Sequence, residues 1–498
     1  MGWSLMNKKV VKGGQVKVLR NDQIADIHDA SVSVLERTGV VVKEEEALKI
    51  LDEAGAFVDF KKQHVRIPRY LVKEAINKCP SGFTLYGRNP KHLVRLEDNK
   101  VHFGMAGVPP NVIDLDGKRR GATWEDVKNF FILSEGLENI HVADFAVWPP
   151  CSSDVEWPVK RLLIAMENTE GPVTVGAKGT RAFVEDYLRL QAIVRGSLDE
   201  LVAKPFWWSH VNPVSPLTYD ERQTRSFLVY AKLGLPIHFG SEVQAGATGP
   251  VTLAGTLVQQ NAENLGGIVI AQLGAETASP KRRPPIIYGT ISTIMDMRTA
   301  SPVLGGPETA LLNIASAQMA DYYGLPSRGV GEGADSKIPD IQAGYETSFA
   351  LLASALAGNN YIYAAGGIEP GIMAISYEKA VLDNDLIGMI IRLLEGINIC
   401  DDTLALDIID EVGPGGNYLA LNHTKDHFRK EHYYPVLFDK NPYEAWVKKG
   451  SKDIREAARE RAKKILREYH AEPLDKDIKR ELEAMSKEIL KKHGEKKP

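Results

Sequence analysis

The stretch from residue 329 to residue 346, GVGEGADSKIPDIQAGYE, holds carboxylates, a lysine and a glutamine close together in the chain. Glycines begin it and an apolar pattern with helical spacing follows, so we expect the exit of a strand and the start of a helix. Glu332 and Asp335 are predicted to project from the end of the strand. Gln342 and Tyr345 are predicted to lie in the first turns of the helix. All four are candidates for contact with a bound ligand.

Burying these carboxylates would be costly unless cations pair with them. Lys337 and Arg328 are nearby in the sequence. A salt-bridge network that only holds the loop is therefore the alternative to ligand binding. Lys337 could also act as a Schiff-base lysine, for which its location is the sole support.

Aromatic side chains stand at the ends of other apolar runs, among them Trp148, Trp208, Tyr288 and Tyr363. Rings and carboxylates together suit a cation that cannot donate hydrogen bonds. A quaternary ammonium group is attracted to the face of a Trp or Tyr ring by about 0.5 to 2 kcal/mol, depending on desolvation. We therefore predict that these four rings and Tyr345 contact such a cation. The alternative is that they are ordinary core residues.

A metal site is a weaker possibility at the same strand ends, where the possible ligands are His210, His238, Glu242 and Glu332. No HxxxH or HxH spacing occurs there, so we predict no metal. The later segment HTKDHF places His423 and His427 four residues apart. We expect that segment to pack against the central domain.

The composition is that of a globular protein, with 498 residues of which 44% are hydrophobic and 25% charged. A net charge of −4 gives no reason to expect nucleic acid binding. The three cysteines form no CxxC and have no close histidine, which argues against disulfides and a thiolate zinc site. The start of the chain lacks the apolar core of a signal peptide, and no run approaches a membrane span. We predict a cytoplasmic, homo-oligomeric enzyme that does not bind membranes.

Eight apolar runs alternate with amphipathic helical patterns from about residue 100 onward. They are VHFGMAG, IHVADFAVWPP, GPVTVGAKG, KPFWWSHVNP, LPIHFGSEV, PPIIYGTIS, LPSRGVGEG and NYIYAAGGIEP. Such a repeat is typical of a (β/α)8 TIM barrel, an α/β fold whose active site lies at the carboxyl ends of the strands. An open doubly wound sheet is the alternative, but no GxGxxG follows a strand.

The barrel is predicted to form the catalytic core over residues 101–400. Residues 1–100 are predicted to form an N-terminal α+β cap layer that contains no catalytic or binding motif. Residues 401–498 are predicted to form a C-terminal extension with a charged helical tail. The density of Lys, Arg and Glu in that tail indicates a solvated face.

Three motifs, GPETALLNIASAQMADYYGLP, ADSKIPDIQAGYE and NHTKDHFR, resemble the trimethylamine methyltransferase family. The resemblance extends over roughly residues 20 to 470. It implies a TIM barrel that moves a methyl group from a methylated amine to the cobalt(I) corrinoid of a separate carrier protein. Archaeal trimethylamine enzymes carry pyrrolysine, whereas this chain has only the twenty standard residues. It therefore resembles the non-pyrrolysine branch, which includes glycine betaine methyltransferases and relatives acting on proline betaine, carnitine or γ-butyrobetaine.

A quaternary amine makes chemical sense in this branch, because its nitrogen is already charged and leaves as a neutral amine. We therefore predict no catalytic acid or base and no tightly bound metal. The cofactor, a corrinoid (cobalamin), is expected to arrive with the partner protein. Gly333, Gly366 and Gly367 are predicted to let the corrinoid approach the backbone closely. The alternative is that these glycines only serve strand-to-loop turns.

A betaine also has a carboxylate, and the candidates to hold it are backbone N–H groups and the side chains of His210, His238, Lys178 and Arg298. We favour His210, which ends the fourth run beside Trp208. Three other interpretations stay open. They are a zinc-dependent methyltransferase with Cys151 as a ligand, a Schiff-base enzyme that uses Lys337 or Lys178, and a betaine-binding protein without turnover.

Overall fold

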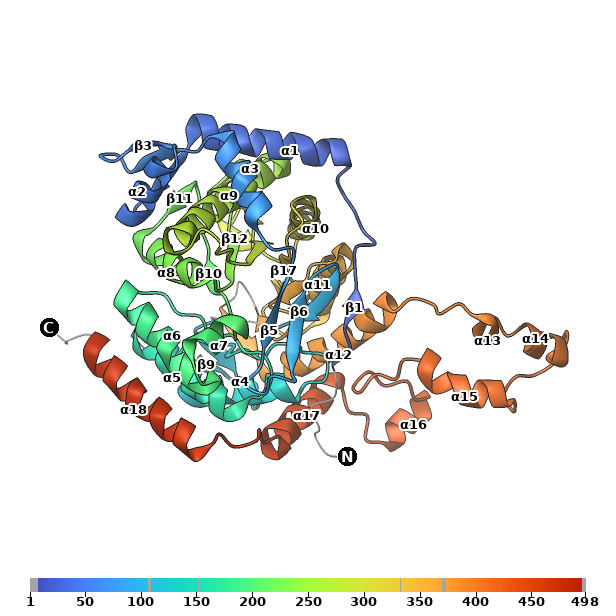
Figure 1. The fold of residues 1–498 in the computed structure, drawn as a ribbon. Helices are drawn as coiled ribbons and strands as arrows, with labels where there is room; N and C mark the ends of the chain where they lie inside the picture. Colours follow the sequence, from blue (N-terminus) through green and yellow to red (C-terminus); the bar gives the residue numbers. More distant parts are fainter. Residues whose placement is uncertain (1–7, 106–108, 151–152, 332, 370–372, 495–498) are drawn as a thin grey trace.

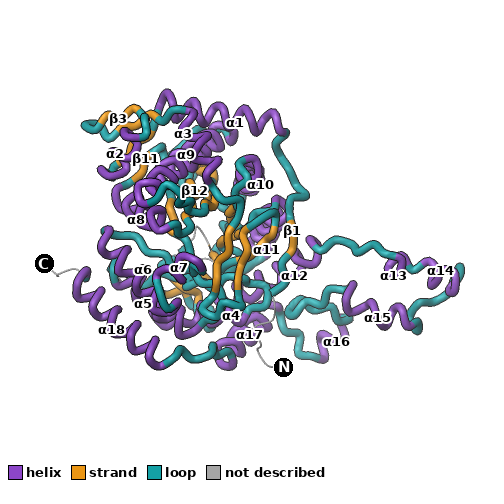
Figure 2. Tube along the Cα trace, in the orientation of Figure 1, coloured by secondary structure: helices purple, strands orange, loops and turns teal. Residues whose placement is uncertain are grey.

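The structure is a computed structural model of the chain and describes residues 8–105, 109–150, 153–331, 333–369 and 373–494. It is a mixed α/β protein in which helices surround several sheets (Figure 2). The largest sheet has the strand order β1-β7-β18-β17-β14-β12-β10. The bounds are Val11–Lys12 (β1), Lys100–Phe103 (β7), Ser209–Val211 (β10), Ile237–Ser241 (β12), Ile286–Thr290 (β14), Ser327–Val330 (β17) and Tyr361–Tyr363 (β18).

Six of the eight predicted runs form strands of this sheet. The fourth to eighth runs (β10, β12, β14, β17 and β18) pair in chain order, and β18 then pairs with β7 of the first run, all in parallel. The second and third runs contribute isolated parallel bridges, Gly104 with Val142 and Ala143 with Val173. Among the described residues, no strand pairing joins the third run to β10, so the closed barrel is not confirmed.

Helices follow the strands along the chain, as the alternating pattern predicts. Their bounds are Trp124–Gly136 (α4), Glu156–Asn168 (α5), Arg181–Arg195 (α6), Leu198–Ala203 (α7), Glu221–Leu233 (α8), Leu253–Ala278 (α9), Pro307–Tyr322 (α10), Ile341–Ala357 (α11) and Tyr377–Leu394 (α12). The helix predicted inside the opening motif is α11. It starts where the Asp340 carboxylate accepts a hydrogen bond from Ala343 N, and it ends at Gly358 in the left-handed region.

Shorter strands join into smaller sheets beside the main one. Their bounds are Val40–Val42 (β2), Phe57–Asp59 (β3), His64–Arg66 (β4), Phe83–Tyr86 (β5), Leu93–Leu96 (β6), Asn111–Ile113 (β8), Arg119–Gly121 (β9), Thr218–Tyr219 (β11), Gln244–Ala245 (β13), Thr293–Asp296 (β15), Ser301–Val303 (β16), Ile368–Glu369 (β19) and Ala374–Ser376 (β20). The sheets have the orders β11-β2-β4-β3, β13-β15-β16, β19-β20-β8-β9 and β5-β6.

The N-terminal helices cover α9 (Figure 1). Their bounds are Asn21–Ser33 (α1), Val34–Thr38 (η1, a π-helical turn), Glu45–Glu53 (α2) and Arg69–Lys78 (α3). Because α9 lies between these helices and strands β12 and β14, it is apolar on nearly every face. This region combines helices with short strands, and its helices pack on α9 behind the main sheet.

The C-terminal helices have the bounds Asp401–Leu404 (α13), Leu406–Val412 (α14), Asn422–Glu431 (α15), Tyr443–Lys448 (α16), Ile454–Glu468 (α17) and Lys476–His493 (α18). Figure 1 shows α17 and α18 lying along the body, whereas α13 to α16 project away from it. α17 packs on α12 and α18 packs on α6, burying Ile465 and Ile489, so each of these helices has one buried face besides its charged, solvated one. Each described helix is too short or too polar to cross a membrane.

Candidate functional site

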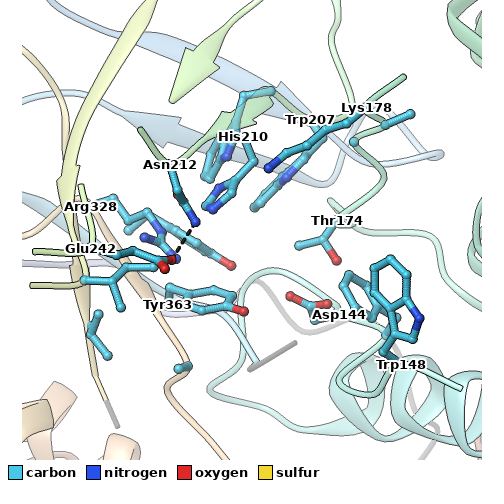
Figure 3. A pocket seen from close by; sticks show the side chains of 18 of the residues that line it. Asp144, Trp148, Thr174, Lys178, Trp207, His210, Asn212, Glu242, Arg328 and Tyr363 are labelled. Carbon is cyan, nitrogen blue, oxygen red and sulfur yellow. Dashed lines mark hydrogen bonds between the residues drawn. The ribbon is translucent and has the colours of Figure 1, made fainter. Parts of the chain in front are cut away.

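A cavity of about 420 Å³ opens at the carboxyl ends of the main strands. Its lining comes from β10, β17 and β18 and from segments that directly follow the strands, which is where parallel α/β folds place ligands. Figure 3 shows Arg328, Asn212 and Glu242 at one end of the cavity and Trp148, beside Asp144, at the other. The lining includes Asp144, Phe145, Trp148, Trp157, Arg161, Lys178, Trp207, Trp208, His210, Asn212, Glu242, Arg328, Tyr361 and Tyr363.

Arg328 is the most deeply buried cation that lines this cavity, with only 1% of its surface exposed. It lies within β17, and its guanidinium stacks 4.2 Å from the centroid of the Tyr363 ring. None of its three guanidinium nitrogens has a hydrogen-bond partner among the described residues. A buried cation with unused donors is costly, so the geometry favours an anionic ligand with oxygens that can accept from it.

Two histidines with uncharged rings lie beside Arg328. His210 and His238 come from the paired strands β10 and β12, and their rings stack with centroids 4.6 Å apart. Burial, followed by the charge of Arg328, holds the pKa of both imidazoles well below the usual range. Neither ring nitrogen of His238 is hydrogen-bonded within the described chain. His210 lines the cavity as predicted.

Lys178 and Glu242 complete this polar end. Burial lowers the pKa of Lys178 to about 8, although the carboxylate of Glu242 opposes the shift. The Lys178 ammonium donates to Gln223 Oε1 at 2.7 Å. Burial also raises the pKa of Glu242, whose Oε1 accepts from Asn212 Nδ2. Because burial raises the pKa of Glu242 and the guanidinium of Arg328 lies close to it, this end favours an anion.

Rings dominate the other end of the cavity. Trp148 stacks on Trp157 with centroids 4.7 Å apart, and Phe145 meets Trp157 edge-on at 5.1 Å. The guanidinium of Arg161 already lies over Phe145, 4.5 Å from its centroid. One ring of this group therefore already makes a cation–π contact with a side chain of the protein.

Asp144 lies next to these rings and is almost fully buried. Burial raises the pKa of its carboxyl group to about 7, although the positive charge of Arg161 opposes the shift. It precedes Phe145 in the loop that follows the second apolar run. A carboxyl group among rings is a suitable neighbour for an ammonium group, because the ion pair would be shielded from water.

Two further indoles line the wall between the two ends. Trp207 and Trp208 stack with centroids 3.7 Å apart, and Tyr361 meets both rings edge-on. Trp208 Nε1 and the Tyr361 hydroxyl have no hydrogen-bond partner within the described residues. Unsatisfied donors that face a cavity indicate polar atoms of a ligand or of water.

The structure brings four of the predicted substrate residues to the cavity: Trp148, Trp208, His210 and Tyr363. Tyr288 is not among them. Its side chain is fully buried on the other side of the sheet, where its hydroxyl donates to Asn261 Oδ1 of α9 at 2.9 Å. Glu332 lies outside the described residues.

The other predicted residues of the opening motif lie outside the lining of the cavity. The Asp335 carboxylate accepts from Leu304 N at 3.2 Å and Gly305 N at 3.1 Å, so backbone groups, and not cations, satisfy it. Gln342 donates to Glu346 on the exposed surface, and Tyr345 is 74% exposed. Asp335, Gln342 and Tyr345, which the sequence predicts as ligand contacts, therefore do not line this cavity.

The three glycines predicted to contact a corrinoid are explained by packing within the chain. A Cβ atom on Gly333 would come within 2.5 Å of Leu304 Cβ, and one on Gly366 within 3.1 Å of Met105 Sδ. Gly367 has a φ of +91°, which other residues rarely adopt. The turn-and-packing alternative therefore accounts for all three.

Arg328 and Asp144 line the cavity, but neither was predicted from the sequence as a ligand contact. Each is a single charge inside an otherwise apolar run, in LPSRGVGEG and IHVADFAVWPP, and that pattern could have identified them. Two predicted alternatives lie elsewhere. Arg298 is exposed and bonded to Asp296, and Lys337 is exposed with its ammonium on Asp335 O. Cys151 lies outside the described residues.

Comparisons with known proteins give consistent matches over nearly the whole chain. The family model described as trimethylamine methyltransferase (MTTB) matches residues 4–493. A glycine betaine methyltransferase of Desulfitobacterium hafniense (strain Y51) is 36% identical over 481 residues, covering 96% of this chain and 98% of the relative. A trimethylamine methyltransferase MttB of Desulfitobacterium hafniense (strain DSM 10664 / DCB-2) is 36% identical over 488 residues, covering 97% and 96%. MttB of Methanosarcina thermophila is 34% identical over 485 residues, covering 95% and 98%.

Identity is equal for two relatives that are named for different amines. The choice between these amines therefore depends on the cavity. Its chemistry differs at the two ends, and a ligand that spans it must satisfy a guanidinium at one end and rings with a carboxyl group at the other.

Proposed function

Because this chain belongs to the trimethylamine methyltransferase family and is a methyltransferase, we propose that it demethylates a quaternary amine that also carries a carboxylate. Glycine betaine is the first candidate, and the cobalt(I) corrinoid of a separate carrier protein is the acceptor. The observation that carries this proposal is the buried guanidinium of Arg328, which has no hydrogen-bond partner among the described residues and lies across the cavity from the rings.

A carboxylated quaternary amine matches both ends of the cavity. Its carboxylate can accept hydrogen bonds from Arg328, with His210 and Lys178 close by. Its trimethylammonium group cannot donate hydrogen bonds and suits the rings of Trp148 and Trp157 beside Asp144. Trimethylamine has no carboxylate and would leave Arg328 buried without a partner, so it is the poorer ligand.

The positions of these residues also orient the substrate. Arg328 lies inside strand β17, whereas Trp148 lies in the loop beyond Val142 and Ala143 of the second run. A betaine held by its carboxylate at Arg328 therefore extends toward the loops. The methyl groups then face the rim, where an acceptor from another protein must approach.

The residues of this chain bind, orient and desolvate the amine, and the cobalt(I) corrinoid of the carrier protein would supply the nucleophile. When the carbon–nitrogen bond breaks, its electron pair stays on nitrogen, and the product leaves as a neutral tertiary amine. No proton from the enzyme is required for that. Loss of the positive charge beside Asp144 favours the protonated form of its carboxyl group, whose pKa of about 7 allows the change.

A site for the carrier protein is suggested by exposed apolar side chains at the rim, on and just before α11. Ile338 is 55% exposed, and Ile341 and Tyr345 are each 74% exposed. The loop before them is fixed by Asp335 to the backbone of Leu304, which lines the cavity. We propose that this surface, the α11 rim, contacts the carrier protein, because exposed large apolar side chains are typical of interfaces.

Changing the α11 rim should separate partner binding from substrate binding. The double variant Ile341→Asp, Tyr345→Ala is expected to slow methyl transfer to the carrier protein by about tenfold or more, because truncating central interface residues costs about 1 to 2 kcal/mol or more. Transfer to free cob(I)alamin should be unchanged. Tyr322→Ala is the matched control, because Tyr322 is also an exposed tyrosine but is the last residue of α10 and does not belong to the α11 rim. Equal rates with the carrier protein for all three proteins would contradict the assignment.

The pKa of Asp144 predicts how binding depends on pH. Below a pH of about 7 its carboxyl group is protonated and does not attract the ammonium group, and above it the carboxylate does. We expect the Kd of glycine betaine, measured by calorimetry, to fall several-fold as the pH rises through about 7. It should rise again above about 8, where Lys178 loses its charge near the substrate carboxylate. Asp144→Asn should remove the acidic limb and keep the basic one, and an unchanged acidic limb would contradict the role of Asp144.

We also infer that the main sheet belongs to a (β/α)8 barrel. Support comes from the six parallel strands in circular chain order and from the two parallel bridges that lead from β7 to the second run and on to the third. With this core over residues 101–400, the proposed division has a cap layer over 1–100 and an extension over 401–498.

The experiment that tests the function is a methyl-transfer assay with free cob(I)alamin, followed by its visible absorbance. Glycine betaine, proline betaine, carnitine, choline and trimethylamine are compared as donors. We expect cob(I)alamin to be consumed with at least one carboxylated quaternary amine, and much more slowly with choline and trimethylamine. Turnover of trimethylamine alone would overturn the proposed substrate class, and no turnover of any quaternary amine would overturn the activity.

A second candidate is favoured by one observation, the lowered pKa of Lys178 inside the cavity. An amine with a pKa of about 8 is partly neutral near physiological pH and could form a Schiff base with a carbonyl substrate. Borohydride trapping of a carbonyl compound on Lys178, absent in Lys178→Arg, would support it.

A further inference from the structure

The C-terminal extension contains an arm, residues 395–453, that leaves the body after α12 and returns before α17 (Figure 1). Its outgoing limb carries α13 and α14, and its returning limb carries α15 and α16. Every residue from 392 to 457 is at least partly exposed, so the arm has no hydrophobic core. Segments without a core need another source of stability, and metal ions commonly provide it in small units.

The base of the arm is fixed to the body by hydrogen bonds. The carboxylate of Asp385 on α12 accepts from the backbone N–H groups of Val436, Leu437 and Phe438, at 2.8 to 3.1 Å. Arg392 donates to Glu431 O at 3.0 Å. These contacts hold the returning limb where it meets the body. They leave the connection between the two limbs, farther out along the arm, to be made by other side chains.

Asp402, His423 and His427 bring the two limbs together. Asp402 lies on α13, and the two histidines lie one turn apart on the same face of α15. His427 Nε2 is 3.3 Å from Asp402 Oδ2, and His423 Nε2 is 3.3 Å from Asp402 O. The two imidazole rings have centroids 4.3 Å apart. One ligand atom from each side chain lies within 4.8 Å of the other two.

We propose that Asp402, His423 and His427, the arm triad, bind a divalent transition metal ion, with zinc as the first candidate. Imidazole nitrogens and a carboxylate oxygen are ligands that zinc prefers, and around a tetrahedral ion such atoms stand about 3.3 Å apart. The spacing of His427 and Asp402 matches that value, and His423 reaches it by rotation of a partly exposed side chain. Three protein ligands leave the fourth position for water.

The arm triad is the only such group among the described residues, which sets it apart from the cavity. His210, His238 and Glu242 line the cavity or lie beside it, but their ligand atoms do not gather in this way. The metal therefore acts as a clip between α13 and α15 and takes no part in methyl transfer. The proposal stands whether or not the proposed function is correct.

Cobalt(II) absorption tests this site directly. Tag-free, chelator-treated full-length protein is titrated with Co(II). We expect one equivalent to produce the visible bands of a nitrogen- and oxygen-ligated tetrahedral ion, and zinc to abolish them. His427→Ala and Asp402→Asn should lose the bands, whereas His432→Ala, just after α15, should keep them. A wild-type protein without the bands, or triad variants with unchanged bands, would overturn the proposal in favour of a simple His427–Asp402 ion pair.

Proteolysis gives an independent readout on the arm itself. Trypsin can cut after Lys425, Arg429 and Lys430 of α15 only when the helix opens locally. Zinc at 100 times its Kd should slow cleavage of the wild type at these sites by up to about 100-fold. It should not protect His427→Ala. Equal protection of both proteins would show that zinc acts elsewhere and would overturn the clip.

Discussion

Replacing Arg328 with methionine should weaken glycine betaine binding by roughly one and a half to three and a half orders of magnitude. Truncating one partner of a buried charge pair costs about 2 to 5 kcal/mol, because the other charge is left unpaired in a closed site. That range corresponds to roughly 30-fold to several-thousand-fold in Kd. Methionine fills a similar length beside Tyr363 without a charge, so the cavity wall is kept. Calorimetric titration measures the change.

Two controls separate a binding role for Arg328 from a structural one. Choline has the ammonium group and no carboxylate, so its weak affinity should be nearly the same in wild type and Arg328→Met. The variant should also melt at an equal or higher temperature, because the change removes a buried cation that has no hydrogen-bond partner among the described residues. Equal losses of affinity for choline and glycine betaine, or a large fall in Tm, would show that Arg328 supports the fold and does not hold the carboxylate.

Trp148→Ala is expected to raise the Kd of glycine betaine by about 3- to 30-fold, since a cation–π contact is worth about 0.5 to 2 kcal/mol. The indole stacks on Trp157 at the ammonium end, so its loss also opens that end to water. The neutral isostere 3,3-dimethylbutanoate has a carbon in place of the charged nitrogen. Its affinity should fall less than that of glycine betaine, because it makes no cation–π contact.

Trp124→Ala is the matched control for this variant. Trp124 stacks on Trp157, 5.4 Å between centroids, but it does not line the cavity. Removing it changes the same group of rings and should leave the Kd unchanged. Similar effects of the two substitutions, or equal losses for the isostere and the betaine, would show that the rings matter only for packing.

The order of strands and helices could be predicted from the sequence, because apolar runs and amphipathic patterns alternate regularly. The two runs that failed to become full strands are IHVADFAVWPP and GPVTVGAKG. Both lead directly into cavity-lining residues, Asp144 in the first and Lys178 in the second. In these two runs the backbone leaves strand geometry early, where it presents side chains to the cavity. Each run therefore forms fewer strand hydrogen bonds than its apolar residues suggest.

The side of the sheet to which each ring points was harder to predict. His238 and Arg328 share the cavity side, whereas Tyr288 occupies the alternate position on β14 and reaches α9. Side chains along one strand alternate between the two faces of the sheet. The register of β14 with β12 and β17 is therefore needed to assign Tyr288 to the face away from the cavity. A single sequence does not contain that register.

The orientation of α11 could not be predicted for a similar reason. Its sequence is apolar on several faces, so the pattern does not distinguish the buried side from the exposed one. In the structure Ala343, Thr347 and Leu351 are buried, which turns Ile341 and Tyr345 outward. Packing against the rest of the protein determines which face of α11 is buried. Tyr345 therefore lies on the exposed α11 rim and not in the predicted ligand site.

The position of glycine betaine in a crystal of the wild-type complex tests the central claim most directly. The account predicts the carboxylate oxygens within hydrogen-bond distance of the Arg328 guanidinium, the trimethylammonium group against Trp148 and Asp144, and one methyl group toward the rim. A betaine bound the other way round, with its ammonium group at Arg328, or bound outside this cavity, would contradict it.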